Sequence, residues 1–483
     1  MTTRNSKVGL WCSDGVIRFT DGTEPYVVGT PSGMMAAVMT GGRLTVYVAD
    51  YGVLTPFIAH VVHALPYNEH RANLSWDGII SQKGRFFSFS VTIDRENSIR
   101  FFDISNLLRE NCRITMTDEQ LLAILSEYDG RGLCKITAGG ASMEAFVAGD
   151  WKWYNGKFPQ LGSDDKRSLH GAYIGGLMLA REGRYGKAID IDCNSMYPSI
   201  LRNEWLPWGE PESYEGEYKP DEDMPLHCDE ITFRAELKSD GYPFLLDNRS
   251  VYGLNRLTST RGYITRVLTD IDQKLLEENY DVTVYEHVRG WKFRRNKGFF
   301  RSFVDEWSEL KQRETGGKRQ MAKLIMNALV GKMASLPKDA VMLPSSKDGV
   351  TVEWDVAHRD GSNLKTDYLP VPVWVNAYAR KKLMAVCRAN ADRLLYANTD
   401  GCILSGWDPV ESCEIHPTEL GKWKVSAKYE RLTILGMNRY QGWRDDGGVD
   451  VCMAGSVFDE PIPYERFRHG VQVRDACGTM VVL

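Results

Sequence analysis

Two aspartates lie in segments whose pattern holds a carboxylate rigidly at the end of a strand. Asp192 ends an alternating apolar run, and Asp400 lies in a polar cluster, Asn398–Gly401, between two apolar runs. The first pattern predicts a strand followed by a turn, and the second predicts a β-hairpin with an exposed polar tip. Carboxylates on such stiff supports suit hard cations such as Mg²⁺. On its own, the second cluster is explained equally well as an ordinary turn, because Asn and Gly favour turns.

Cationic and polar residues recur between the two aspartates at the spacing of one helix face. Four members follow one another at intervals of four residues: Arg319, Lys323, Asn327 and Gly331. Lys311 lies upstream, on what we interpret as the preceding antiparallel helix. Residues four apart lie on the same side of a helix, so this face can bind and neutralise a triphosphate. A solvated basic face without a ligand is the alternative interpretation.

Together these segments resemble, in the right order, the three polymerase motifs of family B DNA polymerases. Residues 192–197, ending in Tyr197, resemble the first motif, and residues 398–401 resemble the third, usually Asp-Thr-Asp. Residues 323–332 resemble the second, typically K-x3-N-S-x-Y-G. Nucleotidyl transfer needs two Mg²⁺ ions about 3.5–4 Å apart. The resemblance implies that Asp192 and Asp400 are the catalytic metal ligands, with Mn²⁺ as a substitute ion. It implies a nucleotide site formed by Lys311, Arg319, Lys323, Asn327 and Tyr197.

The motifs also depart from the family pattern. Asn398 stands where the first aspartate of the third motif is usual, and Ala328 and Val330 replace a serine and a tyrosine. In the family, a tyrosine at the position of Tyr197 packs under the sugar and excludes a ribose 2′-hydroxyl by a clash. A core tyrosine after a turn is the alternative for Tyr197.

The resemblance is strongest to the protein-primed branch, the small polymerases of phages and linear plasmids. Residues 173–176, Tyr-Ile-Gly-Gly, resemble its Y-x-G-G motif, which contacts template. Residues 438–440 stand where a K-x-Y motif holds the primer terminus, with Asn438 in place of the lysine. The implied DNA-binding residues are Tyr173, Gly175, Gly176, Arg439 and Tyr440. The implied partners are primer–template DNA, deoxynucleoside triphosphates and a terminal priming protein.

The N-terminal region lacks the acids that a 3′–5′ exonuclease of this family needs. The segment Cys12–Val16 lacks the acid expected two residues after the first aspartate, and the segment Tyr47–Phe57 lacks the expected Asn and Asp pattern. Leu121 stands where a tyrosine is expected, with Glu127 and Asp129 only nearby. We therefore expect an exonuclease fold without proofreading activity. A displaced site made of Asp14, Asp50 and Asp103 is the alternative.

The fold class that must position these residues is α+β and multidomain. The resemblance implies a right-hand polymerase of palm, fingers and thumb, with an N-terminal RNase H-like exonuclease-type domain. We expect strands at residues 44–48, 86–91, 99–102 and 349–356, a helix over residues 118–126 and a loop at residues 359–366. The segment 225–298 is expected to be strand-rich and ends in the basic residues 291–297. The expected divisions are: 1–150, exonuclease-like; 151–224, a linker (residues 149–170) and first palm segment; 225–298, first terminal-protein-region insertion; 299–336, fingers; 337–369, second insertion; 370–450, palm; 451–483, thumb.

Composition permits this interpretation. The 483 residues exceed one typical core, and 43% hydrophobic with 25% charged residues is ordinary for globular protein. A net charge of −5 argues against a uniformly basic surface but not against a basic channel. Ten cysteines without CxxC spacing indicate reduced thiols. We expect a soluble protein of the bacterial host cytoplasm, without signal peptide or membrane partner.

Three functions remain open at this point. The first is a template-directed, protein-primed and strand-displacing DNA polymerase without proofreading. The second is a polymerase-derived protein that holds primed DNA or a priming protein without chemistry, which Asn398, Val330 and the missing exonuclease acids favour. The third is a short-patch or lesion-tolerant polymerase. Both aspartates and the cationic face favour an enzyme.

Overall fold

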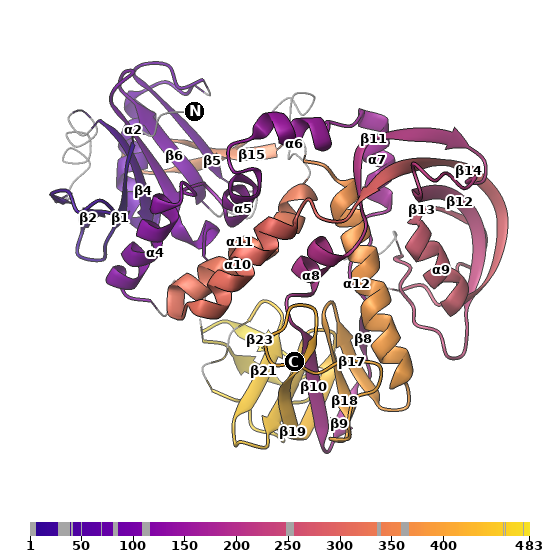
Figure 1. Cartoon of the computed structure of the whole chain (residues 1–483). Helices are drawn as coiled ribbons and strands as arrows, with labels where there is room; N and C mark the ends of the chain where they lie inside the picture. The colour runs from indigo at the N-terminus through magenta and orange to yellow at the C-terminus, as the bar shows by residue number, and fades with distance from the viewer. Residues whose placement is uncertain are drawn as a thin grey trace. The chain divides into compact units, whose positions relative to one another are not determined.

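The computed structural model describes residues 6–27, 39, 42–49, 51–68, 70–80, 86–108, 116–247, 256–335, 340–358, 367–456, 458, 460–476 and 478–483 (Figure 1). The chain forms two compact units. The first unit comprises Met1–Gly156 and Asp305–Asp367, and the second comprises Lys157–Val304 and Tyr368–Leu483. Each unit is thus built from two separate stretches of the chain.

The first unit contains a mixed sheet with nine strands among the described residues, in the order β16-β15-β5-β6-β7-β4-β1-β2-β3. Its centre is parallel, because β4 pairs in parallel with β1 on one side and β7 on the other. Five consecutive residues of β4 are buried, as expected for a central strand covered on both faces. The expected strands at 44–48, 86–91 and 99–102 are confirmed. The strand bounds are β1 (Ser6–Trp11), β2 (Val16–Phe19), β3 (Tyr26–Val27), β4 (Arg43–Val48), β5 (Ser75–Ile80), β6 (Phe86–Thr92), β7 (Ser98–Asp103), β15 (Ala340–Ser345) and β16 (Glu353–His358).

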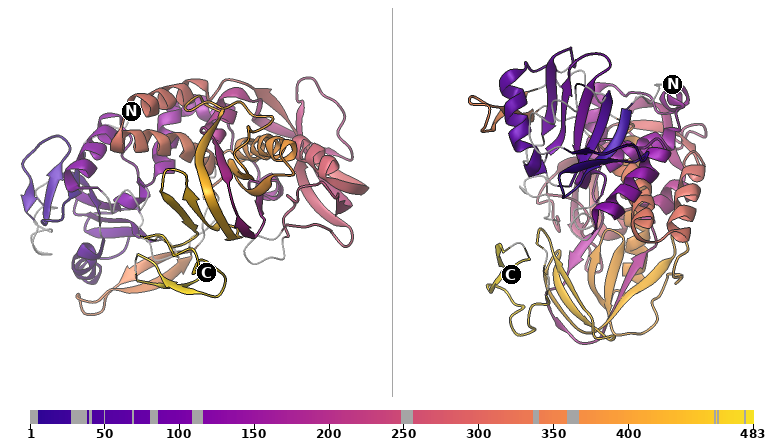
Figure 2. Two further views of the ribbon diagram at one scale, coloured as in Figure 1. Left: turned by 90° about the horizontal axis from the view of Figure 1, so that it is seen from below. Right: turned by 90° about the vertical axis from the view of Figure 1, so that its left-hand side faces the viewer.

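Helices of the first unit include a pair that carries the cationic residues. α10 (Arg301–Arg313) and α11 (Gly316–Met333) lie side by side after a two-residue connection (Figures 1 and 2). The expected helix over 118–126 is confirmed as part of α4 (Asp118–Gly130), where Thr117 and Gln120 form a capping box. Further helices among the described residues of this unit are α2 (Thr55–Ala64), α5 (Ala138–Val147) and all but the last residue of α6 (Trp151–Lys157), with the short 3₁₀ turns η1 (Tyr51–Leu54) and η2 (Ile104–Asn106).

The second unit contains the sheet that carries both aspartates. Its order is β21-β20-β19-β10-β18-β17-β8, and β9 also pairs with β19, which gives eight strands among the described residues. β10 lies inside the sheet, antiparallel to β18 and β19. α8 (Met196–Asn203) packs against α12 (Pro370–Ala389). The strand bounds are β8 (Met178–Ala180), β9 (Gly183–Tyr185), β10 (Ala188–Cys193), β17 (Leu394–Asn398), β18 (Gly401–Ser405), β19 (Trp423–Gly436), β20 (Arg439–Arg444) and β21 (Val449–Met453).

A smaller four-stranded sheet forms the strand-rich segment expected at residues 225–298. Its order is β11-β14-β12-β13, and β14 is the longest of these strands at 17 residues. The basic residues 291–297 form the end of β14 and the turn after it. The bounds are β11 (Leu206–Glu215), β12 (Leu226–Leu237), β13 (Ile264–Thr269), α9 (Asp270–Asn279) and β14 (Tyr280–Asn296).

The structure bears on two expectations about connecting segments. The segment 149–170, expected as a linker, contains the point after Gly156 at which the chain passes from the first unit to the second, and it forms two helices, α6 (Trp151–Lys157) and α7 (Ser163–Gly171). The strand expected at 349–356 begins later, at β16, because Asp348 accepts backbone hydrogen bonds from Val350 and Thr351 and forms a turn there. The expected loop at 359–366 lies outside the described residues.

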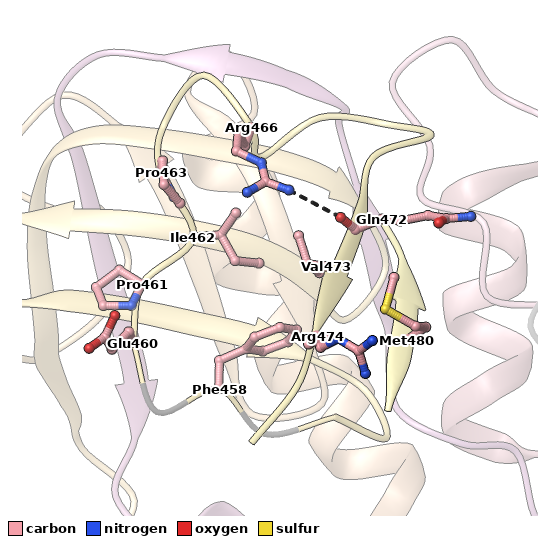
Figure 3. A pocket seen from close by; sticks show the side chains of 10 residues that line it. All are labelled: Phe458, Glu460, Pro461, Ile462, Pro463, Arg466, Gln472, Val473, Arg474 and Met480. Atoms are coloured by element: carbon pink, nitrogen blue, oxygen red, sulfur yellow. Dashed lines mark hydrogen bonds between the residues drawn. The ribbon is translucent and has the colours of Figure 1, made fainter. Parts of the chain in front are cut away.

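The C-terminal residues Ile462, Phe467, Val473 and Leu483 pack in a small core together with Leu435 of β19 and Met453 of β21. The strands β22 (Gln472–Arg474) and β23 (Met480–Val482) pair with each other. A pocket of about 470 Å³ lies beside them (Figure 3). Among the described residues that line it, Glu460 carries a carboxylate, and Arg466 and Arg474 carry guanidinium groups. No helix in the described part of the chain is long and apolar enough to cross a membrane.

Candidate active site

Asp192 is held at the end of the central strand of the second unit. On β10 it is paired with Gly401 of β18 on one side and Lys424 of β19 on the other. The next residue, Cys193, donates its backbone N–H to the Asp400 carbonyl at 2.8 Å. Ser195 then adopts φ +52°, which turns the chain into α8. The expected strand, turn and carboxylate at the strand end are confirmed.

Asp400 occupies the tip of the predicted hairpin. β17 ends at Asn398 and β18 begins at Gly401, so the connection has two residues. Thr399 has φ +60°, and the Asp400 N–H donates to the Asn398 carbonyl at 2.6 Å. A Cβ at Gly401 would lie 2.8 Å from the Ile191 carbonyl oxygen. Glycine there lets β10 and β18 approach closely and brings the hairpin tip beside Asp192.

The two aspartates line one cleft of about 230 Å³. A third carboxylate, Asp190, lies in the same cleft, because residues two apart on a strand share a face. Burial, and then the charge of Asp192, raises the pKa of Asp190 to about 7. The Lys424 ammonium lies 3.1 Å from Asp192 Oδ2 and compensates its charge. The other lining residues are Tyr396, Asn398, Gly401, Cys402, Ile403, Ser426, Tyr440 and Cys452.

The donors of this cleft fit Mg²⁺. The carboxylate oxygens of Asp190, Asp192 and Asp400 are hard ligands carried by adjacent strands. Among the described residues no three or more His, Cys, Asp or Glu side chains form a ready-made metal cage. Mg²⁺ is commonly bound by one or two carboxylates and completes its octahedron with water and phosphate oxygens. The cleft could therefore hold the ion together with a phosphate-bearing substrate.

Tyr197 lies on the first turn of α8, close to this cleft. Burial raises the pKa of its hydroxyl well above the usual range, and the next largest cause is the negative charge of Asp400. The ring is half-buried, with part of its surface open. Tyr197 is therefore near Asp400. A substrate bound at the two aspartates would lie close to the Tyr197 ring.

The Tyr-Ile-Gly-Gly segment packs directly on the hairpin that carries Asp400. The Thr399 N–H donates to the Leu177 carbonyl at 3.0 Å, and a Cβ at Gly176 would lie 2.9 Å from the Thr399 Cα. The buried Arg380 of α12 also fixes the segment, since its Nη1 donates to the carbonyls of Ile174 and Gly175. Tyr173 is half-buried at the start of the segment. These predicted DNA-binding residues thus also support the hairpin that carries Asp400.

Replacing Gly176 with alanine is expected to lower the rate of nucleotide incorporation. The added methyl group would meet the backbone of Thr399, so the hairpin must move and shift Asp400. A small misplacement of a reacting group can cost a hundredfold, and we expect a loss of about tenfold or more in kcat. Gly186→Ala is the matched control, because nothing lies within 4 Å of its Cβ position. Equal rates for the two variants would contradict this role of Gly176.

Arg439 and Tyr440 begin β20, after the turn that contains Asn438. The Tyr440 ring packs against the Tyr396 ring with centroids 5.2 Å apart, and both line the aspartate cleft. Arg439 is half-buried beside Gly436, near Glu182. The predicted primer-binding turn therefore adjoins the predicted metal site within the same unit.

The cationic face lies on α11 in the first unit, whereas the aspartate cleft belongs to the second. Arg319 and Lys323 are exposed, and the opposite face of α11 is buried, so the predicted amphipathic helix is confirmed. Arg319 donates to the Lys311 carbonyl at 3.2 Å, which joins α11 to α10. The Asn327 Nδ2 donates to the Lys323 carbonyl, one turn earlier in α11, at 2.9 Å. Val330 is 5% exposed and packs in the core, while Ala328 is half-buried.

The candidate exonuclease acids have local structural partners. Asp14 is exposed and forms an ion pair with Arg18, and Asp103 caps η2 by accepting from the Ser105 N–H at 2.8 Å. Asp50 lies outside the described residues. Leu121 is buried in α4, at the position where a catalytic tyrosine is expected. Glu127 pairs with Arg131 and Lys318, and Asp129 accepts from Thr20 at 2.8 Å.

Sequence reasoning missed Asp190, Lys424 and Arg380. The sequence contains a signal for Asp190, because the alternation in β10 places it on the same face as Asp192. Nothing in the sequence marks Lys424, since its contact with Asp192 arises only from the pairing of β10 with β19. No such signal marks Arg380, because it is the first of three consecutive basic residues and only the structure shows that it is the buried one.

Residues 133–413 match the family described as DNA polymerase type B, organellar and viral. The DNA polymerase of Bacillus phage Nf is 31% identical over 320 residues, which are 64% of this chain and 56% of that protein. That of Bacillus phage phi29 is 31% identical over 328 residues, 66% of this chain and 56% of the relative. The chain thus spans little more than half the length of these relatives.

The fold resembles a solved structure over the whole chain. Phi29 DNA polymerase in a ternary complex with primer–template DNA and incoming nucleotides has a TM-score of 0.87. The similarity covers 100% of this chain and 99% of that chain, at 22% identity. Phi29 DNA polymerase with single-stranded DNA gives a TM-score of 0.84. The expected α+β multidomain architecture of a right-hand polymerase with an exonuclease-like domain is confirmed.

Proposed function

Since the chain belongs to the organellar and viral type B DNA polymerases, we propose that it is a template-directed DNA polymerase that adds deoxynucleotides to a primer 3′-hydroxyl. The single observation that carries this proposal is the cleft in which Asp192 and Asp400 meet on β10 and the β17–β18 hairpin. A protein that only held primed DNA would not require two carboxylates on one rigid sheet. That alternative is therefore not favoured.

Asp192 and Asp400 would hold two Mg²⁺ ions, and ions bound there would supply the charge stabilisation that nucleotidyl transfer to a primer hydroxyl needs. Lys424 compensates the charge of Asp192 when no ion is bound. The cations of α10 and α11, Lys311, Arg319 and Lys323, together with Asn327, bind the triphosphate. Tyr173, Gly175, Gly176, Arg439 and Tyr440 bind primer–template DNA beside the cleft.

We further propose that the N-terminal sheet does not proofread. A two-metal exonuclease site needs several carboxylates that are free to bind cations. Asp14 is engaged by Arg18, Asp103 caps a turn, and Leu121 replaces a site residue. The relatives' polymerase identity is compatible with either outcome, so this part depends on the residues of this chain.

The priming mode follows the phage relatives. We propose that the chain extends a protein primer and displaces the non-template strand, in the cytoplasm of a bacterial host. The support is the similarity to DNA polymerases of Bacillus phages. The segments at 225–298 and 337–369 are the proposed contacts for the priming protein and for DNA, respectively.

One labelled oligonucleotide tests synthesis and proofreading together. With a primer annealed to templates that carry each of the four bases, we expect incorporation of the complementary deoxynucleotide only. Without nucleotides, the same primer should keep its length over the same period. Incorporation that ignores the template base would refute template direction, and a ladder of shortened primers would refute the absence of proofreading.

Replacing Tyr197 with valine is expected to weaken discrimination against ribonucleotides. The smaller side chain removes the clash that excludes the 2′-hydroxyl, whereas the metal ligands stay in place. We expect the ratio of kcat/KM values for dNTP and rNTP to fall by about tenfold or more, as for other pocket changes of this size. Tyr263→Val, an exposed tyrosine in the same unit, serves as the control. Unchanged sugar selectivity in single-nucleotide assays would disprove the assignment.

A further inference from the structure

Two asparagines forty residues apart in the sequence are hydrogen-bonded to each other at the edge of the cleft. The Asn398 Nδ2 donates to Asn438 Oδ1 at 2.8 Å. The hydroxyl of Tyr396 lies 3.3 Å from both side chains and accepts the Asn438 backbone N–H at 3.2 Å. Thr399 Oγ1 donates to Asn398 Oδ1 at 2.7 Å. The amide of Asn398 is thus bonded through both its nitrogen and its oxygen.

The bond joins two turns that the proposed function uses for different tasks. Asn398 ends β17 and precedes Asp400 by two residues, whereas Asn438 lies in the β19–β20 turn directly before Arg439 and Tyr440. Asn438 has φ +54°, a left-handed conformation that asparagine tolerates better than most residues. Its carbonyl also accepts the Ala454 N–H at 3.0 Å, which fixes the turn. The bond therefore links a held turn to the hairpin of Asp400.

Charge explains why a neutral side chain suits position 398, which lines the cleft. The cleft already contains the carboxylates of Asp190, Asp192 and Asp400. A further carboxylate at position 398 would add repulsion in a half-buried place. An amide makes the same contact without charge, and its partner at position 438 is neutral as well. Both positions are those at which this chain departs from the motifs described above.

We propose that Asn398 and Asn438 act as one positioning pair, a neutral clamp that fixes the Asp400 hairpin to the β19–β20 turn. The inference rests on the proposed function for its effect on catalysis, but the clamp itself is a property of the fold. Neither asparagine touches the reacting atoms. They act through Asp400, because they fix the position of its carboxylate relative to the turn that is proposed to bind the primer.

A double-mutant cycle tests the pair. Asn398→Ala removes one amide, and Asn438→Gly removes the other at no backbone cost, because glycine accepts the left-handed conformation. We expect Asn438→Gly to lower kcat for single-nucleotide incorporation about tenfold, on the order of one hydrogen bond, with KM for the dNTP within about twofold. Asn398→Ala also removes the bond from Thr399 and should lower kcat at least as far. The double variant should lose no more than the larger single loss. Two results would overturn the pair. One is a single variant with unchanged kcat, and the other is a double variant in which the two single losses multiply to about a hundredfold.

Two further variants separate the clamp from general loosening of the fold. Ser412→Gly removes an exposed side chain at another left-handed residue, φ +55°, and should leave kcat unchanged. Asn438→Asp tolerates the same backbone and keeps an acceptor oxygen for Asn398, so we expect kcat within about threefold of the unaltered chain. If Asn438→Asp lost as much activity as Asn438→Gly, the hydrogen bond would not be the cause.

Hydrogen exchange gives a readout that does not depend on activity. In the unaltered chain the amides of Thr399 and Asp400 are bonded to the carbonyls of Leu177 and Asn398. Asn438→Gly should speed deuterium uptake in a peptide covering residues 396–404, although position 438 lies outside that peptide. Unchanged uptake would refute the clamp. An unaltered chain that extends no primer would instead refute the proposed function, and the exchange result would still decide the clamp.

Discussion

Replacement of Asp400 by asparagine is expected to lower the rate of primer extension by about a thousandfold or more, because a metal ion supplies several kcal/mol of charge stabilisation in the transition state. Asparagine keeps the size of the side chain and its place in the hairpin, but it binds Mg²⁺ far more weakly than a carboxylate. The backbone contacts of Asp400 with Cys193 and Asn398 remain. The variant should therefore fold normally and bind DNA without extending it.

The control for this prediction is Asp392→Asn, which makes the same chemical change at an exposed residue of the same unit. Its extension rate should equal that of the unaltered chain. Rates are measured by single-turnover incorporation of one dNTP at saturating Mg²⁺. An Asp400→Asn variant that keeps more than about a tenth of the normal rate would show that Asp400 holds no essential ion.

Replacement of Arg380 by methionine is expected to lower the free energy of unfolding of the second unit by about 3–5 kcal/mol. The side chains of Arg380 and Asp272 are both fully buried and form a bidentate ion pair, with Nη2 2.7 Å from each carboxylate oxygen. Removing the guanidinium leaves the Asp272 charge buried without its counter-ion. It also removes the donor to Ile174 and Gly175, so activity should fall together with stability.

Arg388→Met provides the comparison on the same helix. Arg388 pairs with Glu278 at 3.0 Å, but both side chains are largely exposed, and such pairs are worth about 1 kcal/mol or less. Urea unfolding should thus show a large shift for Arg380→Met and little for Arg388→Met. Adding Asp272→Leu to Arg380→Met should recover part of the loss, because no buried charge then remains. Equal shifts for the two arginine variants would contradict a special role for the buried pair.

Local patterns were sufficient to predict the parts of the site that one strand or one helix defines. The strand that ends near Asp192 follows from its apolar alternation, and the hairpin of Asp400 follows from the polar cluster between two apolar runs. The four-residue spacing predicted the exposed face of α11, since helix geometry alone places Arg319 and Lys323 together. Each of these depends on neighbours in the sequence.

Features made by contacts between distant segments could not be predicted in this way. The pairing of Lys424 with Asp192 depends on the register of β10 and β19, which are more than 200 residues apart. The contact of Gly176 with Thr399 requires two loops to meet. The linker at residues 149–170 was predicted but its two helices were not, because their many polar and aromatic residues obscure any apolar periodicity.

Extension of a labelled primer on a template, with and without Mg²⁺, tests the central claim most directly. The claim is that the Asp192 and Asp400 cleft performs metal-dependent nucleotidyl transfer. We predict that the unaltered chain adds complementary nucleotides when Mg²⁺ is present and none when the ion is chelated. Failure to extend the primer with either Mg²⁺ or Mn²⁺, or extension that continues under chelation, would contradict the claim.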